Sequence, residues 1–286
     1  MARSPANAVK EETFEGMGGL KIFLRSWKPA SKPRGVVVIC HGVNSHGGQY
    51  ISVGEQFAAS GFATYALDLR GRGKSDGPRF FVNNISEYVS DVSNTIKLAK
   101  ARDPGLPVFL LGHSAGGVVS CSYALDHQAE ITGLICESFA FKVPAPDFAL
   151  AIIKGLSRIA PNLPVLTLKN KDFTRDPVAL QALNNDPLIA KEVQPALTVA
   201  ALVRADERLK KEFPRITLPV FILHGTADKA TVPSGSQFFY DTVGFKGEKT
   251  KALRRPLPRS PERYRQGKGH GGYQGLDRKA PLNSSA

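Results

Sequence analysis

Residues 107–119 read PVFLLGHSAGGVV, and this stretch decides the fold. Residues 108–111 form a continuous apolar run of the kind that predicts a buried strand. The run ends at Gly112, and Gly116 follows four residues later, with Ser114 midway between the two glycines. Apolar residues then resume from Gly117 onward, where we expect a helix to begin. The stretch therefore predicts a strand, a sharp turn and a helix in immediate succession.

The G-x-S-x-G pattern at the turn is typical of a nucleophile elbow, in which a serine is lifted off the end of a sheet. A side chain at position 112 or 116 would collide with the crossing strand and helix, so both positions need glycine. The following helix would direct its free backbone amides toward Ser114. The alternative is a glycine-rich turn without a chemical role, and the other motifs of the chain must decide between the two.

The length and composition favour one large α/β domain, or one domain with an insertion. The chain has 286 residues, of which 42% are hydrophobic, enough for a sizeable core. No apolar run reaches the length of a membrane span, and the N-terminal residues lack the apolar region of a secretory signal. Cys40, Cys121 and Cys136 are an odd number of cysteines in or beside apolar segments. They predict buried thiols in a reducing compartment, and hence a cytoplasmic protein, rather than disulfides or a metal site.

The net charge of +13 belongs mostly to the end of the chain. Residues 246–286 contain 11 Lys or Arg and 3 Asp or Glu, which leaves a charge of only +5 on the other 245 residues. A nucleic-acid-binding protein would be expected to carry its basic residues on a folded surface. We therefore expect no nucleic-acid partner.

Apolar runs alternate with helical patterns along the first half of the chain and again near residue 220. Strands are predicted at residues 20–27, 35–40, 62–67, 108–111, 132–137 and 218–223, and helices at 52–60, 85–101, after 117 and at 234–243. This alternation predicts a mostly parallel, doubly wound α/β sheet.

Residues 141–214 interrupt this alternation with proline-rich turns and helical pieces at 148–159 and 195–209. The segment carries apolar residues such as Phe148, Ile152 and Leu163 that the predicted sheet does not need. We interpret it as a helical cap or lid over an apolar acyl pocket. Ordinary packing of these helices on the core is the alternative.

Three loops follow predicted strands at the edge where open α/β sheets bind their ligands. Residues 41–50, HGVNSHGGQY, supply a glycine-rich loop. In residues 68–78, DLRGRGKSDGP, the charges of Asp68 and Arg70 are better explained as braces between neighbouring loops than as substrate ligands. Asp228 follows the strand at 218–223, and the order Ser114 then Asp228 fits a Ser–Asp–His triad.

Five motifs together resemble the monoacylglycerol lipase and lysophospholipase branch of the α/β-hydrolases. They are HGVNSHGGQY, DLRGRGKSDG, LLGHSAGG, NDPL at 185–188 and LHGTADK at 223–229, in the order of that family. The resemblance covers about residues 14–245. It implies an α/β-hydrolase core at 14–140 and 215–245 and a helical cap at 141–214. Residues 246–286 are left as a basic tail, whose composition predicts disorder.

The resemblance also implies roles for individual residues. Ser114 matches the nucleophile, Asp228 matches the acid that orients the catalytic imidazole, and the amides of Val43 and Ala115 match the oxyanion hole. A serine hydroxyl needs a neighbouring base to become a strong nucleophile, and each oxyanion donor contributes roughly 3–4 kcal/mol. His41 and His113 are expected to line the substrate site. No cofactor and no metal ion are implied.

The catalytic histidine is where this sequence departs from the family. Only nine of the 41 residues at 246–286 are Ala, Leu or Tyr, and none is Val, Ile, Phe, Met, Trp or Cys. This composition predicts disorder and no final strand or closing helix. The only histidine after Asp228 is His270, 42 residues further on. We hypothesise that the tail is the family's C-terminus read in a shifted frame. Permitted codons for residues 253–281, read with the frame shifted by one nucleotide, can give a sequence that begins Tyr-Glu-Gly-His-Tyr-His-Asp-Leu-Leu-Asn and continues as an amphipathic helix.

The function predicted from these features is hydrolysis of a carboxylic ester through an acyl-Ser114 intermediate. Its substrate would carry one acyl chain, as in a monoacylglycerol, a lysophospholipid or a short aryl ester. A peptidase or thioesterase on the same fold remains an alternative, since the cap sets the substrate. A second alternative is a non-catalytic ligand-binding protein. Transient lipid contact through the cap is expected, and the sequence leaves the oligomeric state open.

Overall fold

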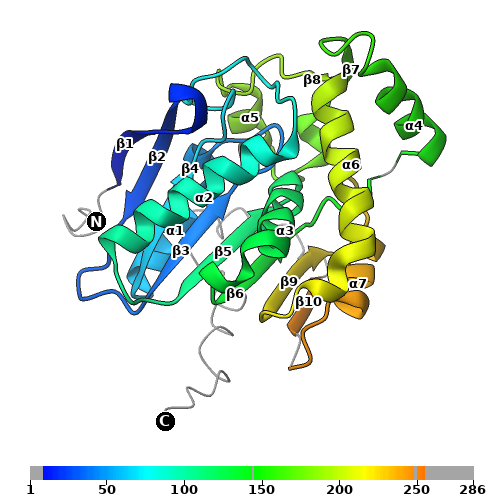
Figure 1. The fold of residues 1–286 in the computed structure, drawn as a ribbon. Helices are drawn as coiled ribbons and strands as arrows, with labels where there is room; N and C mark the ends of the chain where they lie inside the picture. Colours follow the sequence, from blue (N-terminus) through cyan, green and yellow to red (C-terminus); the bar gives the residue numbers. More distant parts are fainter. Residues whose placement is uncertain (1–8, 144, 248–249, 255–286) are drawn as a thin grey trace.

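The structure is a computed structural model that describes residues 9–143, 145–247 and 250–254. Within these ranges, eight strands form one sheet in the spatial order β1-β2-β4-β3-β5-β6-β9-β10 (Figure 1). The strands are β1 (Lys10–Glu15), β2 (Lys21–Trp27), β3 (Gly35–Cys40), β4 (Phe62–Leu67), β5 (Val108–His113), β6 (Gly133–Glu137), β9 (Val220–Gly225) and β10 (Thr250–Arg254). Strand β2 runs antiparallel to β1 and β4, and all neighbours from β4 to β10 are parallel.

Helices cover both faces of this sheet, as parallel strands require for their crossover connections. The connecting helices are α1 (Ile51–Ala59), α2 (Ile85–Arg102), α3 (Ala115–His127) and α7 (Pro233–Thr242). Every residue of β3 and β4 is buried, which explains why these strands read as continuous apolar runs rather than alternating ones. The predicted doubly wound, mostly parallel α/β fold is confirmed.

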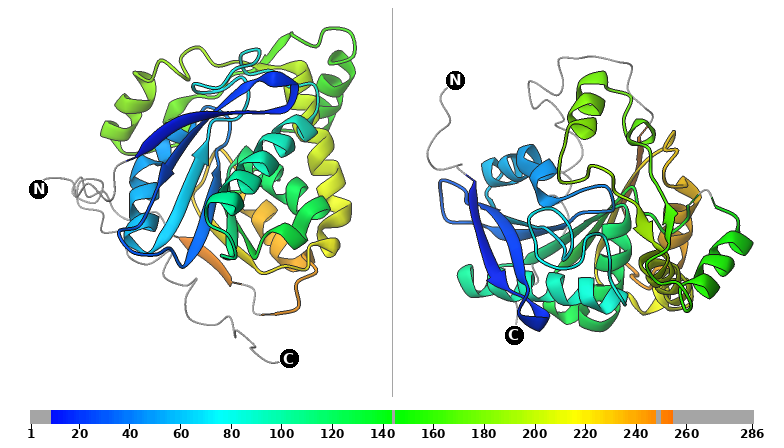
Figure 2. Two further views of the ribbon diagram at one scale, coloured as in Figure 1. Left: turned by 60° about the vertical axis from the view of Figure 1, so that its left-hand side comes forward. Right: turned by 90° about the horizontal axis from the view of Figure 1, so that it is seen from above.

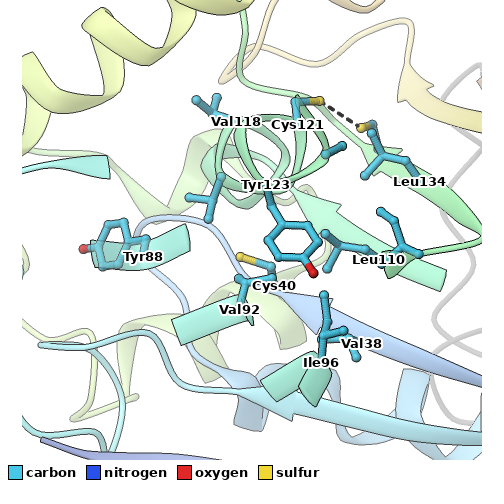
Figure 3. Packing of buried hydrophobic residues seen from close by; sticks show 14 of the residues in the cluster. Val38, Cys40, Tyr88, Val92, Ile96, Leu110, Val118, Cys121, Tyr123 and Leu134 are labelled. Atoms are coloured by element: carbon cyan, nitrogen blue, oxygen red, sulfur yellow. Dashed lines mark hydrogen bonds between the residues drawn. The ribbon is translucent and has the colours of Figure 1, made fainter. Parts of the chain in front are cut away.

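The core lies in two layers on the two sides of the sheet. One layer packs α2 and α3 onto the sheet, with Val92 and Ile96 facing Val38 and Leu110 (Figure 3). The other layer surrounds the fully buried Trp27 and includes residues of α1. These layers hold the carboxyl ends of the parallel strands at one edge, where the loops carrying Ser114 and Asp228 begin.

A helical segment connects β6 to β9. It contains α4 (Asp147–Leu156), β7 (Pro164–Leu166), α5 (Pro177–Asn184), β8 (Gln194–Pro195) and α6 (Ala196–Glu212). The helices predicted at 148–159 and 195–209 are confirmed as α4 and α6. Helix α6 packs on α3 and on α4, and Figure 2 shows α4 at the periphery of the molecule, outside α6.

Strand β10 corrects one expectation from the sequence. The residues after 245 were not expected to supply a last strand, yet Thr250–Arg254 pairs in parallel with β9, from Phe221 to Gly225. An edge strand is held by backbone hydrogen bonds to its neighbour, so a composition poor in β-branched residues does not prevent it. Residues 255–286, including His270 and most of the segment of the frame-shift hypothesis, lie outside the described residues. None of the described helices is both long and apolar enough to cross a bilayer.

Candidate active site

Ser114 occupies the turn that the sequence predicts. Strand β5 ends at His113 and α3 begins at Ala115, and Ser114 between them has φ 54° and ψ −124°. A positive φ is strained for a residue other than glycine. The surrounding backbone holds it in place, because the Ser114 N–H donates to the Glu137 carbonyl and the Ser114 carbonyl accepts from the Gly117 N–H, both at 2.9 Å. These two backbone hydrogen bonds therefore hold the Ser114 backbone in its strained conformation at the end of β5.

Two glycines allow the backbone to close around Ser114. A Cβ on Gly116 would lie 2.2 Å from the carbonyl oxygen of Cys40, and a Cβ on Gly42 would lie 2.9 Å from Cβ of Ser114. Both distances are shorter than van der Waals contact. The loop after β3 and the start of α3 can therefore approach each other only because these positions are glycine.

Ser114 borders a cavity of about 270 Å³ together with Val43 and Ala115. Ala115 is the first residue of α3, so its N–H has no acceptor within the helix and lies at the positive end of the helix dipole. The rest of the wall is mostly apolar. Its apolar members are Val118, Ala140, Val143, Ala145, Ala149, Leu150, Ile153, Leu166, Leu168, Phe173, Val199, Leu202, Val203 and Ala230. The cavity can thus hold a hydrocarbon chain beside Ser114.

Asp228 lies in the turn after β9. Its Oδ1 accepts the backbone N–H groups of Ala230 and Thr231 at 2.9 Å, and its Oδ2 accepts the Thr231 hydroxyl at 2.8 Å. Lys229, Ala230 and Thr231 border the cavity of Ser114. The carboxylate is therefore fixed by three donors next to this cavity, at the carboxyl end of the sheet.

His224 is a neighbour of Asp228 that the sequence analysis missed. Its Nε2 lies 3.6 Å from Oδ2 of Asp228, and its Nδ1 lies 2.7 Å from the hydroxyl of Ser236. Burial lowers the pKa of His224, although the charge of Asp228 opposes this. Its position four residues before Asp228 in LHGTADK was the available signal. No histidine of the described residues borders the Ser114 cavity.

His41 and His113 hold loops in place instead of lining the cavity, which corrects the expectation that they contact substrate. His41 is fully buried; its Nδ1 lies 2.7 Å from the Gly42 carbonyl oxygen, and its Nε2 accepts the Leu69 N–H at 3.0 Å. His113 Nδ1 lies 2.8 Å from the Tyr50 hydroxyl. Both ring nitrogens of His41 and Nδ1 of His113 are thus bound to groups of the protein.

A buried polar cluster ties the loop of Val43 to the segment between β6 and β9. Glu192 Oε1 accepts the Asn44 N–H at 2.9 Å, the amide of Gln194 at 2.6 Å, and the guanidinium Nη1 of Arg72. Burial opposes the charge of Arg72, but Tyr88 and Glu192 outweigh it and raise its pKa. The sequence analysis missed this cluster because its members are far apart along the chain.

Asp68 and Arg70 are braces, as expected. Asp68 Oδ1 accepts hydrogen bonds from the Gly47 N–H at 2.6 Å and from the Arg25 guanidinium at 2.9 Å. Arg70 forms a bidentate ion pair with Asp91 through Nε and Nη2. Neither borders the Ser114 cavity. The described residues also contain no group of three or more His, Cys, Asp or Glu side chains that could hold a metal ion.

Comparison with known proteins agrees with this geometry. The family model for serine aminopeptidase, S33, matches residues 31–255. The monoacylglycerol lipase of Mycolicibacterium smegmatis is 34% identical over 237 residues, which are 82% of this chain and 84% of the relative. The monoglyceride lipase of Homo sapiens is 29% identical, covering 76% of this chain and 73% of the relative.

A solved structure shows the same similarity in three dimensions. The crystal structure of Paleococcus ferrophilus monoacylglycerol lipase superimposes with a TM-score of 0.73 at 32% identity, over 82% of this chain and 88% of the other. The mostly parallel sheet with flanking helices is therefore a fold that this chain shares with a monoacylglycerol lipase.

Proposed function

We propose that Ser114 is the nucleophile of this chain, which belongs to the serine aminopeptidase S33 family of hydrolases. The chain is a serine ester hydrolase, in line with its lipase and esterase relatives. The observation that carries the assignment is the strained turn at Ser114, which borders a mostly apolar cavity together with Val43 and Ala115.

The mechanism follows from these positions. The Ser114 hydroxyl loses its proton to an imidazole and its oxygen attacks the ester carbonyl. The ester C–O bond then breaks, the imidazolium gives the proton to the leaving oxygen, and an acyl-serine and a free alcohol result. The N–H groups of Val43 and Ala115 stabilise the tetrahedral oxyanion, and the Asp228 carboxylate orients the imidazole. Water then cleaves the acyl-serine by the same steps. We assign the imidazole to residues beyond 254, either His270 or the histidine that a restored frame would encode across Pro258 and Arg259.

The substrate proposed is an ester with a single acyl chain, such as a monoacylglycerol or a lysophospholipid. A cavity with mostly aliphatic walls favours a hydrocarbon chain over the polar backbone of a peptide. We further assign residues 14–140 and 215–245 to the catalytic core and 141–214 to the cap, since α4 and α6 supply much of the cavity wall.

We propose that the cap makes transient contact with lipid surfaces. Phe148 and Ile152 lie one turn apart on α4 and are 70% and 57% exposed, and Ile159 beyond the helix is 86% exposed. Apolar side chains exposed together on one face of a helix are typical of membrane-surface contact. A Phe148→Ser, Ile152→Ser variant should bind phosphatidylcholine vesicles less well and still hydrolyse a dissolved ester.

We also propose a cytoplasmic location. Cys40, Cys121 and Cys136 are buried free thiols, and the Sγ atoms of Cys121 and Cys136 lie 3.7 Å apart, joined by a hydrogen bond and not by a disulfide (Figure 3). Burial raises the pKa of Cys40 to about 12, so this thiol is held in its unreactive form. Free thiols in close proximity fit a reducing compartment.

Labelling with a fluorophosphonate probe tests the nucleophile. The wild-type chain should incorporate one probe per molecule, and Ser114→Ala should incorporate none. A series of p-nitrophenyl esters of increasing chain length, given to this chain and to a frame-restored version, then tests turnover. If neither version is labelled or hydrolyses any ester, the ester hydrolase is refuted. The alternative would then be a non-catalytic protein that binds its ligand in the Ser114 cavity, which no described histidine borders.

A further inference from the structure

Asp206 lies at the boundary between two cavities. It is on α6 and borders the Ser114 cavity of about 270 Å³, and it also borders a second cavity of about 730 Å³. The second cavity lies among α4, α6 and α7 and shares Val143, Leu150 and Val203 with the first. Asp206 is therefore in a position to contact a ligand in the Ser114 cavity.

The carboxyl group of Asp206 has no hydrogen-bond partner at Oδ1 among the described residues, and this atom is buried. Burial raises the pKa of Asp206 well above its usual range, and the neighbouring charge of Glu207 acts in the same direction. The surroundings thus favour the neutral acid, which has one O–H donor and further acceptor capacity. A buried polar group without a partner destabilises a protein, so a ligand that supplies the partner would recover this cost.

The two charged residues that follow Asp206 on α6 have partners of their own. Glu207 pairs with Lys154, and Arg208 binds Asp126 at 2.6 Å and 2.9 Å. No such pairing explains Asp206 within the described ranges, and its neighbours in the Ser114 cavity include Val118, Leu150, Val199 and Leu202. Its carboxyl group therefore contributes no structural bond that would account for an acid in an apolar wall.

Asp206 and Ser114 border the same cavity from different helices. Val118, one turn after Ser114 on α3, lines this cavity as well. On α6 the lining residues are Val199, Leu202, Val203 and Asp206, whose spacing of three and four residues places them on one face of the helix. An acyl chain on Ser114 would therefore meet apolar side chains of α6 and one carboxyl group among them.

We propose that Asp206 is a hydrogen-bonding subsite in the acyl cavity, and that it selects acyl chains that carry a hydroxyl group over plain hydrocarbon chains. The inference rests on the proposed function, because that function places the acyl chain in the Ser114 cavity. A hydroxyl group can both accept a hydrogen bond from the neutral acid and donate one to it. A plain hydrocarbon chain covers the carboxyl group without forming a hydrogen bond to it. A site that hydrogen-bonds a ligand hydroxyl discriminates strongly against the analogue that lacks it.

Binding of free fatty acids to the full-length protein tests the subsite without requiring turnover. Dodecanoic acid and its monohydroxy derivatives compete against a fluorescent fatty acid, with the hydroxyl near the carboxyl group, in mid-chain or at the terminal carbon. The wild type should bind the acid whose hydroxyl reaches Asp206 about fivefold more tightly than dodecanoic acid, and the other positions should give a smaller preference. Asp206→Leu should reverse this preference, and Asp206→Asn should keep it because the amide still donates and accepts.

Glu207→Gln is the matched control, since Glu207 borders only the second cavity, and it should behave as the wild type. Equal preference in the wild type and Asp206→Leu, or a preference that is the same at every hydroxyl position, overturns the subsite and leaves the proposed function standing. Failure of all acids to displace the probe overturns both. If Asp206→Leu does not fold, the position dependence in the wild type and Asp206→Asn decides.

Discussion

Replacing Glu192 with leucine should destabilise the protein strongly, because it leaves a buried charge unpaired. The side chains of Glu192 and Arg72 are each 1% exposed. Removing one partner of a buried ion pair costs about 3–5 kcal/mol, and the Asn44 N–H that loses its acceptor adds about 1–3 kcal/mol. Arg72 keeps its bonds to Tyr88 and Gln194, so we expect the lower part of this range, about 4 kcal/mol in total. That is a large share of the roughly 5–15 kcal/mol by which such domains are stable.

Urea unfolding followed by tryptophan fluorescence measures this loss. Trp27 is the only tryptophan and is fully buried, so its emission reports the core directly. The control is the double variant Arg72→Met, Glu192→Leu, which removes both charges. We expect it to recover more than half of the loss, since apolar residues can replace a buried pair with little cost.

The same variant should impair the reaction centre. Asn44 follows Val43, and its N–H is bound to Glu192, so the single variant releases the loop that carries one proposed oxyanion donor. Fluorophosphonate labelling of Ser114 should slow in Glu192→Leu. The reasoning is refuted if the single variant loses less than about 1 kcal/mol, the value of an exposed pair, or if the double variant is no more stable than the single one.

Three further changes test the elbow and the loop beside it. Gly116→Ala should abolish folding or cost more than about 3 kcal/mol in urea unfolding, because its Cβ would meet the Cys40 carbonyl; wild-type stability would contradict the packing. Ser114→Gly should raise the free energy of unfolding by about 1–2 kcal/mol by relieving the strained φ, and Ser114→Ala, which keeps a Cβ, serves as control. Burial lowers the pKa of His41 in the folded protein well below the pKa of a histidine in the unfolded chain. At about pH 6 the unfolded chain therefore binds a proton on His41 that the folded protein does not bind, and the free energy of unfolding should fall as the pH drops from about 7 to about 5. His41→Asn should show a shallower fall than the wild type over that interval, and identical slopes would contradict a neutral buried His41.

Local patterns determined much of the fold before any tertiary contact was known. The elbow was predictable because its constraint is local: Gly112, Ser114 and Gly116 lie within five residues, and the strained turn they form needs these residue types. The parallel sheet was predictable because strands buried on both faces must be apolar throughout. The position of Asp228 followed from the chain order of strands whose carboxyl ends meet at one edge.

Only the tertiary structure decided which polar groups find partners. Glu192 meets Asn44 and Arg72 across more than one hundred residues, and no local pattern encodes a contact at that separation. His41 looked available for substrate in the sequence, but folding buries it against Gly42 and Leu69. The last strand forms because β9 offers it a free backbone edge, whatever its composition. Burial and pairing are properties of the packed chain, so only the packed chain shows that Asp206 differs from acids such as Asp68 and Asp91: its buried Oδ1 has no hydrogen-bond partner among the described residues.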